Sequence, residues 1–325
     1  MNSVSWDVVG VGANSVDSVL LLPDHLPSLT VSTKIRLRAQ TTRCGGQTAT
    51  ALATCAALGL KTKYIGVVGR DAAGRRIREA LARRGINVAH LIERDAGTQT
   101  ATTLVHMDTG ARVVLSDRDP RLSLRPVDVP TEALRSTRVL HVDDVDVAAS
   151  IEAATAARAA GALVTSDFDH VSDRTEELMD LVTHPILSEE TPHLLTGIAS
   201  PEDALRDLRR RHPGVLCVTQ GERGALALDG DRLYHQPAFP VVARDTTGAG
   251  DVFRGAFIYG LLRGWTVPDI LEFAAAAAAV SCTRLGAFDG VPTLEDVEPL
   301  VKAAARHAAR DGSKAPLEAT TGAPD

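Results

Sequence analysis

Asp245-Thr-Thr-Gly-Ala-Gly-Asp251 is followed by an apolar run, Val252 to Leu262, which predicts a helix that begins among the glycines. The first N–H groups of a helix have no partner within it, and with the helix dipole they form a site that binds anions. Asp251 stands at this end, where a carboxylate would repel a bound anion. Two interpretations stay open here. Asp251 is either an ordinary acid in a first turn, or it takes a proton from a hydroxyl that attacks a phosphoryl group held by the amides.

The sequence on either side of this stretch alternates short apolar segments with helical segments. Short apolar runs bounded by Gly, Pro or Asp predict buried strands, and strands that alternate with helices favour an α/β fold with a mostly parallel central sheet and helices on both faces. The strands expected are Trp6–Val11, Tyr64–Val68, Val139–Val142, Leu163–Ser166, Ile186–Leu187 and Val215–Thr219, and the helices expected are Thr48–Leu58, Asp71–Arg84, Ala148–Ala160, Glu176–Leu181, Ala204–Arg211 and those that begin near Gly250 and Val267.

Three early segments do not fit such a sheet. Lys34–Thr42 alternates polar and apolar residues, which is typical of an exposed strand. Ala101–His106 and Arg112–Ser116 flank Asp108-Thr109-Gly110, which is a hairpin signal. We therefore expect these strands to form a small separate layer.

The composition excludes several classes of protein. The net charge is −6 with no long basic run, which argues against nucleic acid as a partner, and the chain has no Gly-x-x-x-x-Gly-Lys-[Ser/Thr] phosphate loop. The most apolar segment, Phe273–Val280, is far shorter than the roughly 20 residues of a membrane helix, and the N-terminus lacks a signal-peptide pattern. The four scattered cysteines suit reduced thiols. We expect a cytoplasmic protein without a membrane partner, whose residues from about Arg306 onward form a disordered tail.

The opening stretch closely resembles the second signature of the ribokinase/PfkB family of carbohydrate kinases. Three further segments resemble family motifs and occur in family order over roughly residues 6 to 300. They are Gly12-Ala-Asn-Ser-Val-Asp17, similar to the opening sugar-binding strand; Cys44-Gly-Gly-Gln-Thr-Ala49 with Ile65-Gly-Val-Val-Gly-Arg-Asp71, similar to the first signature; and Thr219-Gln-Gly-Glu-Arg-Gly224, similar to a nucleotide-side turn.

The resemblance implies a ribokinase-like three-layer α/β sandwich over residues 1–305, followed by the tail at 306–325. A small β-sheet lid would come from strands within about 13–43 and 98–117. The family uses ATP with Mg²⁺, which is held largely by phosphates and water. Relatives often pair through their lids, and the exposed edges of such a sheet favour pairing, so a homodimer is expected.

Carried over position by position, the resemblance gives each matching residue a role. Asp251 would be the general base, and the backbone of Gly248, Ala249 and Gly250 would form the anion hole. The sugar would be held by Asn14, Asp17, Gly45, Gly46 and Gln47, with Lys34 as a further candidate; the nucleotide would be lined by Ser188, Thr219, Gly221, Gly224 and Thr247; Glu190 is the candidate Mg²⁺ ligand, and Asp245 the candidate for a monovalent cation such as K⁺.

The chain departs from the family pattern at three places. Gln47 stands where the family usually has Asn, so its amide reaches further. The Asn-x-x-Glu motif, which supports Mg²⁺ and phosphate, reads Ser188-Glu-Glu-Thr191, and this leaves the Mg²⁺ role of Glu190 open. Within residues 284–290 a glycine occupies the place of a late serine that helps relatives bind K⁺, so potassium dependence is also open.

The identity of the phosphate acceptor follows less directly from the sequence. Lys34 either faces solvent on an exposed strand or contacts an anionic group of the substrate. The segment His141-Val-Asp-Asp-Val-Asp146 is acidic, which argues against a sulfonated or phosphorylated sugar, although Ser188 resembles the ketohexokinase and sulfofructose-kinase side of the family. We expect a neutral ketose or a related sugar. The alternatives are a nucleoside kinase of the same fold and a non-catalytic sensor of sugar or nucleotide.

Overall fold

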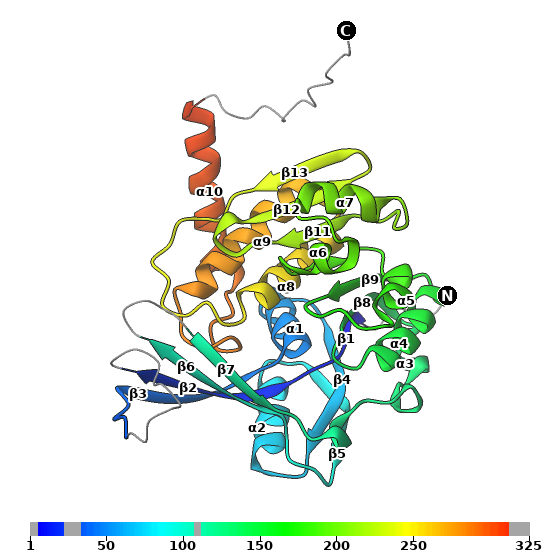
Figure 1. Cartoon of the computed structure of the whole chain (residues 1–325), viewed down its shortest axis with the longest axis vertical. Coiled ribbons are helices and arrows are strands. Elements are labelled where there is room, and N and C mark those ends of the chain that lie inside the picture. The colour runs from blue at the N-terminus through cyan, green and yellow to red at the C-terminus, as the bar shows by residue number, and fades with distance from the viewer. Residues whose placement is uncertain (1–5, 23–33, 107–111, 312–325) are drawn as a thin grey trace.

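The centre of the protein is a mostly parallel sheet (Figure 1). The computed structural model describes residues 6–22, 34–106 and 112–311. A five-stranded parallel sheet has the order β5-β4-β1-β8-β9, and paired residues Thr165–His184 and Phe168–Leu187 extend it to a second sheet, β10-β11-β12-β13, whose last two strands are antiparallel. The strands are β1 (Trp6–Val11), β4 (Thr62–Gly69), β5 (Asn87–Arg94), β8 (Thr137–Asp143), β9 (Leu163–Asp167), β10 (Ile186–Leu187), β11 (Leu216–Thr219), β12 (Ala225–Asp229) and β13 (Arg232–Gln236).

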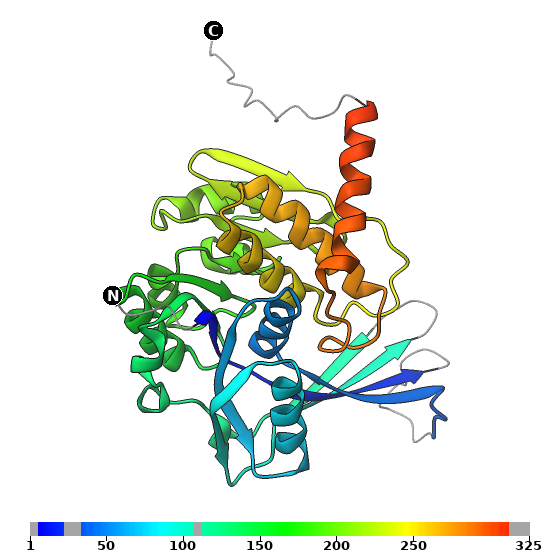
Figure 2. The same cartoon turned by 180° about the vertical axis from the view of Figure 1, so that it is seen from behind.

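Helices cover both faces of this sheet and produce the expected three layers (Figure 2). Successive side chains of a strand point to opposite faces, so Val8 and Val9 of β1 enter two different cores. One core contains residues of α1 (Gln47–Ala57), α2 (Ala72–Arg83), α8 (Ala249–Arg263), α9 (Val267–Cys282) and α10 (Leu294–Asp311); the other contains residues of α3 (Thr131–Leu134), α4 (Val147–Ala159), α5 (Thr175–Leu181), α6 (Thr191–Thr196) and α7 (Pro201–Arg209). Both faces of β1 are therefore buried, and this explains its continuous apolar sequence.

A separate four-stranded sheet projects from this body in both views (Figures 1 and 2). Its order is β3-β2-β6-β7, and its strands are β2 (Ser15–Leu22), β3 (Ala39–Gly45), β6 (Thr100–His106) and β7 (Arg112–Asp117). We call it the lid sheet. Only Gly12, Ala13 and Asn14 separate β1 from β2, so the lid sheet continues directly from the centre of the body. The predicted turn at Asp108–Gly110 lies outside the described residues.

The chain differs from the sequence-based expectation at two element boundaries. The exposed strand expected over Lys34–Thr42 begins only at Ala39 and continues to Gly45, because its partner β2 pairs from Leu21 back to Ser15. At the C-terminus, α10 extends to Asp311 and so passes residue 305, where we expected the tail to begin. The alanines after Lys302 favour helix and account for this extension. No helix among the described residues is long and apolar enough to cross a membrane.

The parallel strands all end at one edge of the sheet, which we call the carboxyl edge. The segments that follow β1, β8, β9, β10 and β11 leave the sheet there, and α1 and α8 begin at the same edge (Figure 1). Ligands of open α/β sheets bind outside the carboxyl ends of the strands. The fold therefore brings the predicted motifs together although they are far apart in the sequence.

Candidate active site

The first turn of α8 follows Gly248, where the backbone conformation and the close approach of Ala287 favour glycine. Gly248 is the residue before the helix and has φ 78°, a left-handed conformation that strains any other residue. A Cβ on Gly248 would lie 2.4 Å from the Cβ of Ala287. Gly248 has no side chain to cap the helix, so the N–H groups of Gly250 and Asp251 remain available to an anion, whereas the N–H of Ala249 donates to the Thr246 carbonyl at 3.3 Å.

Asp245 fixes the loop that leads into this helix. Its Oδ1 accepts the N–H of Thr247 at 2.9 Å, and its Oδ2 accepts the N–H of Gly286 at 2.8 Å. The carboxylate therefore joins the loop before α8 to the loop after α9. The predicted contact of Asp245 with a monovalent cation would use its backbone carbonyl, so that contact stays a prediction beside these side-chain bonds.

We expect that Asp245→Ala lowers kcat about tenfold, because two N–H groups lose a charged acceptor worth roughly 1–3 kcal/mol each and the anion-binding loop loses its tether. Initial rates of ADP release measure the effect. The matched control is Asp269→Ala, which removes the bond from Thr266 Oγ1 in the first turn of α9. Equal kcat in the two variants would contradict a role for Asp245 at the site.

Asp251 lies in the first turn of α8 and keeps some contact with solvent. Desolvation raises the pKa of its carboxyl to about 7; Arg254 lowers that pKa, and Asp169, Asp143 and Asp17 raise it further. A carboxyl with a pKa near neutrality can accept a proton and release it again at physiological pH. Its position beside free helix N–H groups therefore suits a general base.

Hydrogen bonds of buried side chains hold the turn between β1 and the lid sheet. Asp143, at the end of β8, accepts the N–H of Ala13 at 2.6 Å and the hydroxyl of Thr48 at 2.7 Å. Asn14 donates its amide to Tyr64 Oη at 2.8 Å and to the Val67 carbonyl at 2.9 Å. The amide nitrogen of Asn14 is thus bonded within the protein, whereas its buried Oδ1 has no partner among the described residues.

Four other predicted sugar-binding residues gather beside this turn. Asp17 of β2 accepts the hydroxyl of Ser15 at 2.7 Å, and burial raises its pKa. A Cβ on Gly45 would lie 2.1 Å from Asp17 Oδ2, and one on Gly46, where φ is 99°, would lie 2.3 Å from the Cα of Asn14. Gln47 is the first residue of α1. Both glycines are therefore required by the close approach of the strands.

Lys34 lies apart from this group. The β2–β3 pairing runs from Ser15 opposite Gly45 at the carboxyl edge to Leu21 opposite Ala39 at the outer end. At about 3.3 Å per residue, that outer end is roughly 20 Å from Gly45. Lys34 precedes Ala39 and is exposed, so the described chain does not bring it to the other sugar-side residues.

The predicted nucleotide-side residues follow the neighbouring strands β10 and β11. Thr219 ends β11 and donates its hydroxyl to the Leu187 carbonyl at 3.4 Å. Gly221 and Gly224 bound a tight turn with φ values of 56° and 93°, and a Cβ on Gly224 would meet the Gln236 carbonyl at 2.0 Å. Ser188 follows β10 and donates its N–H to the Phe168 carbonyl at 2.8 Å. These residues thus lie along the same carboxyl edge.

Comparison with known proteins shows the family of this chain. The family model described as "pfkB family carbohydrate kinase" matches residues 7–294. The chain belongs to the pfkB family of carbohydrate kinases. It is 32% identical over 284 residues to a fructokinase of Klebsiella pneumoniae (78% of this chain, 90% of the relative) and 26% identical over 282 residues to a 5-dehydro-2-deoxygluconokinase of Geobacillus thermodenitrificans (79% and 84%).

Solved structures of pfkB-type kinases share the fold. A putative ribokinase from Agrobacterium tumefaciens superposes with a TM-score of 0.86 at 26% identity, covering 93% of this chain and 99% of that one. A putative ribokinase II from E. coli, in complex with ATP and Mg²⁺, superposes with a TM-score of 0.79 at 22% identity, covering 92% of this chain and 99% of that one. The expected ribokinase-like fold and the expected class of enzyme, an ATP-dependent carbohydrate kinase, are confirmed.

The described residues of this pfkB kinase form no carboxylate cage for a metal. Thr191, at the family's Glu position, is buried and donates its hydroxyl to the Phe168 carbonyl at 3.0 Å. Glu190 is exposed. No group of three or more His, Cys, Asp or Glu side chains within the described ranges could hold a metal. Nucleotide phosphates and water would therefore have to supply most ligands of a Mg²⁺ ion at this site, and the contact with Glu190 stays a prediction.

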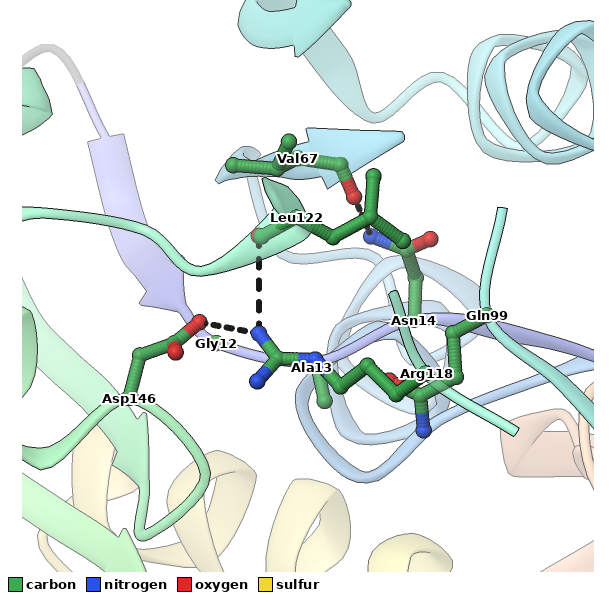
Figure 3. A pocket seen from close by; sticks show the side chains of 8 residues that line it. All are labelled: Gly12, Ala13, Asn14, Val67, Gln99, Arg118, Leu122 and Asp146. Atoms are coloured by element: carbon green, nitrogen blue, oxygen red, sulfur yellow. Dashed lines mark hydrogen bonds and ion pairs between the residues drawn. The ribbon is translucent and has the colours of Figure 1, made fainter. Parts of the chain in front are cut away.

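The ion pair between Arg118 and Asp146, close to the predicted sugar-binding residue Asn14, was not predicted from the sequence of this pfkB kinase (Figure 3). Arg118 donates to Asp146 Oδ2 at 2.5 Å and to the Leu122 carbonyl at 3.5 Å. The pair borders a small cavity of about 10 Å³ that Gly12, Ala13, Asn14 and Gln99 also line. Arg118 directly follows β7, the last strand of the lid sheet, where the chain must return to the body. This position is the one signal in the sequence that could have indicated a role for Arg118 near the site.

Proposed function

We propose that this kinase transfers the γ-phosphoryl group of ATP to a hydroxyl of a small neutral sugar, with Asp251 as the general base. The observation that carries the proposal is the position of Asp251 in the first turn of α8, next to uncapped N–H groups and with a pKa of about 7. Phosphoryl transfer needs a base for the hydroxyl and donors for the phosphoryl oxygens, and both are supplied here within one helical turn.

In the proposed reaction the acceptor hydroxyl gives its proton to the Asp251 carboxylate while its oxygen bonds to the γ-phosphorus. The bond between that phosphorus and the β–γ bridging oxygen breaks, and ADP leaves with the electron pair. The backbone N–H groups of Gly248 and Gly250 hold the transferring group in line, and the N–H of Ala249 would join them on leaving the Thr246 carbonyl, to which it donates at 3.3 Å. Mg²⁺, when bound, neutralises charge on the nucleotide phosphates. Thr247 is held by Asp245 next to these donors.

The charges at the sugar side support a neutral acceptor. Arg118 is paired with Asp146, and Asp143 accepts the N–H of Ala13 and the hydroxyl of Thr48. Asp144 accepts the N–H groups of Asp169 and His170, both at 2.6 Å. The acidic segment noted in the sequence is therefore bonded internally. Asp17 supplies a carboxylate that can accept hydrogen bonds from neighbouring hydroxyls, which suits a polyol.

The second candidate is a nucleoside kinase, because one relative, from Methanothermobacter thermautotrophicus, is named a nucleoside kinase and is 28% identical over 292 residues (88% of this chain, 92% of the relative). The third candidate, a sensor without activity, is disfavoured by the intact Asp251 and the glycines of the α8 turn.

A screen of ADP release separates these candidates. The panel contains ketoses, aldoses, sugar acids, polyols and nucleosides, each with ATP and Mg²⁺. We expect the highest kcat/KM for a neutral ketose. A preference for a sugar acid would contradict the neutral acceptor, and a preference for adenosine or inosine would establish the nucleoside kinase. Measurable sugar binding without turnover of any acceptor would favour the sensor.

The dimer, the potassium effect and the cytoplasmic location stay predictions. A dimer through the lid sheets is supported by Val113 and Leu115, exposed apolar residues of the edge strand β7. Light scattering at micromolar concentration should give twice the mass of one chain, and a monomer would contradict the dimer. Rates measured in KCl and in tetramethylammonium chloride test the potassium effect.

A further inference from the structure

A buried arginine lies directly beneath the anion-binding turn. Arg254 belongs to α8, one turn after Gly250 and Asp251, and is only 2% exposed. Its Nη2 pairs with Oδ1 of Asp167, at the end of β9, at 2.6 Å. Burying two charges costs several kcal/mol each, and an apolar pair of similar volume is often as stable. Stability alone therefore gives a weak reason for an ion pair at this place.

The guanidinium reaches back to the helix start because Gly250 has no side chain. A Cβ on Gly250 would lie 2.7 Å from Nη1 of Arg254. Cβ atoms of a helix tilt toward its N-terminus, so this position is on the side of the turn where an anion binds. Nε of Arg254 is buried and has no hydrogen-bond partner among the described residues. The guanidinium thus keeps a donor that no other described residue uses.

Arg254 also contacts the segment in which the chain departs from its family. Nη2 of Arg254 donates to Ser188 Oγ at 3.2 Å. Ser188 holds the first place of the altered Asn-x-x-Glu motif, and Thr191 at its last place is bonded to Phe168 instead. The motif therefore carries Ser and Thr at the places of Asn and Glu, and the positive charge of Arg254 lies beside it.

We propose that Arg254 is a positioning residue of phosphoryl transfer, which packs against Gly250 and adds a fixed positive charge beside the anion hole. This inference rests on the proposed function. The charge of Arg254 favours the ionised form of Asp251 and stabilises negative charge on the transferring phosphoryl group.

Asp167 lies among other carboxylates. Burial raises the pKa of its carboxyl well above the usual range, Arg254 opposes the rise, and Asp251, Asp169 and Asp144 add to it. The main effect of Asp167 on Arg254 is to fix the orientation of the guanidinium, together with Ser188.

The test compares Arg254→Met, Arg254→Lys, Asp167→Asn and the double variant Arg254→Met/Asp167→Asn. ADP release is measured with ATP and D-fructose and with ATP alone. Binding of ADP with and without aluminium fluoride, in the presence of Mg²⁺, is measured by calorimetry because that complex resembles the transferring phosphoryl group. The control is Arg263→Met, which removes an exposed arginine at the other end of α8 that stacks on Tyr259 at 4.9 Å.

We expect that Arg254→Met lowers the rate of ADP release about 10–100-fold and weakens the aluminium fluoride complex by a similar factor, while ADP alone binds within threefold of wild type. The acid limb of kcat/KM should move to higher pH, since Asp251 loses the charge that favours its ionised form. The Lys variant should recover part of both losses. The double variant should regain the Tm lost in the single variants without regaining rate.

A double variant that regains both Tm and rate would overturn the inference, because Arg254 would then serve only as the partner of Asp167. The same holds if Arg254→Lys, which keeps the charge, binds the aluminium fluoride complex as weakly as Arg254→Met. If Arg254→Met fails to fold, the Lys and double variants still decide the question. Failure of the proposed function looks different, because the wild-type protein would then turn over no acceptor and Asp251→Asn would match its rate.

Discussion

Replacing Asp251 with Asn is expected to lower kcat by about 10²–10⁴-fold, the loss typical of a removed general base. The amide of Asn cannot take the proton of the acceptor hydroxyl. ATP binding should change little, because the N–H groups of the first turn of α8 belong to the backbone. Steady-state kinetics with the best acceptor, together with calorimetry for ATP, measure both quantities. A variant that retains more than a tenth of the wild-type rate would disprove the role of Asp251.

The raised pKa of Asp251 also predicts how activity and stability of the wild type and of Asp251→Asn depend on pH. The base must be ionised, so kcat/KM of the wild type should fall as the pH drops below about 7. The folded protein binds the proton of Asp251 more tightly than the unfolded chain does. The free energy of unfolding of the wild type therefore decreases as the pH rises through 7. Asp251→Asn should therefore be more stable than wild type at pH 8, by roughly 1–2 kcal/mol given the partial exposure of the group. The difference should vanish near pH 4.

Replacing Gly248 with Ala is expected to lower kcat about 10²–10³-fold, the loss seen when donors of an anion hole are misplaced. The left-handed backbone at φ 78° costs a non-glycine residue roughly 1–2 kcal/mol. The added Cβ would also meet Ala287 at 2.4 Å, so the turn has to move. Movement of this turn displaces the N–H groups that hold the phosphoryl oxygens.

The same helix supplies the control for this substitution. Gly264 follows the last turn of α8, has φ 70° and would place a new Cβ in open space. Gly264→Ala should therefore cost similar stability through its backbone while leaving kcat within twofold. Circular dichroism melting curves and ADP release separate the two effects. Equal kcat losses in both variants would show that loss of stability, and not the geometry of the turn, lowers the rate.

Local patterns predicted the elements that carry the motifs. The helix after Asp251 and the buried strands β1, β4, β8 and β11 follow from apolar runs and glycines, and the structure places them within a few residues of the predicted bounds. β5 was not predicted, because Asn87–Arg94 mixes charged and apolar residues at a half-buried edge of the sheet. α6 was also not predicted, because the six residues of Thr191–Thr196 are too few to show a helical repeat of apolar positions.

Contacts over long distances in the sequence could not be predicted in this way. Arg254 interrupts an apolar run, and nothing in the sequence indicates that β9 and β10 bring Asp167 and Ser188 beside it. Arg118 meets Asp146 only because the chain returns from the lid sheet at that point. Both side chains depend on partners that tertiary structure alone selects. Glycines and anion-binding turns are visible in a sequence because their constraints are local.

The direct passage from β1 into β2 has a mechanical consequence. The three residues between these strands are bonded to Asp143, Tyr64 and Val67 of the body. The lid sheet therefore begins at the place where the sugar is proposed to bind. At the outer end of the sheet, roughly 20 Å away, a tilt of about 10° at these three residues would move the strands by about 3–4 Å. A fluorescent probe at exposed Val113, near the outer end of β7, would therefore test whether a ligand bound beside these residues tilts the sheet.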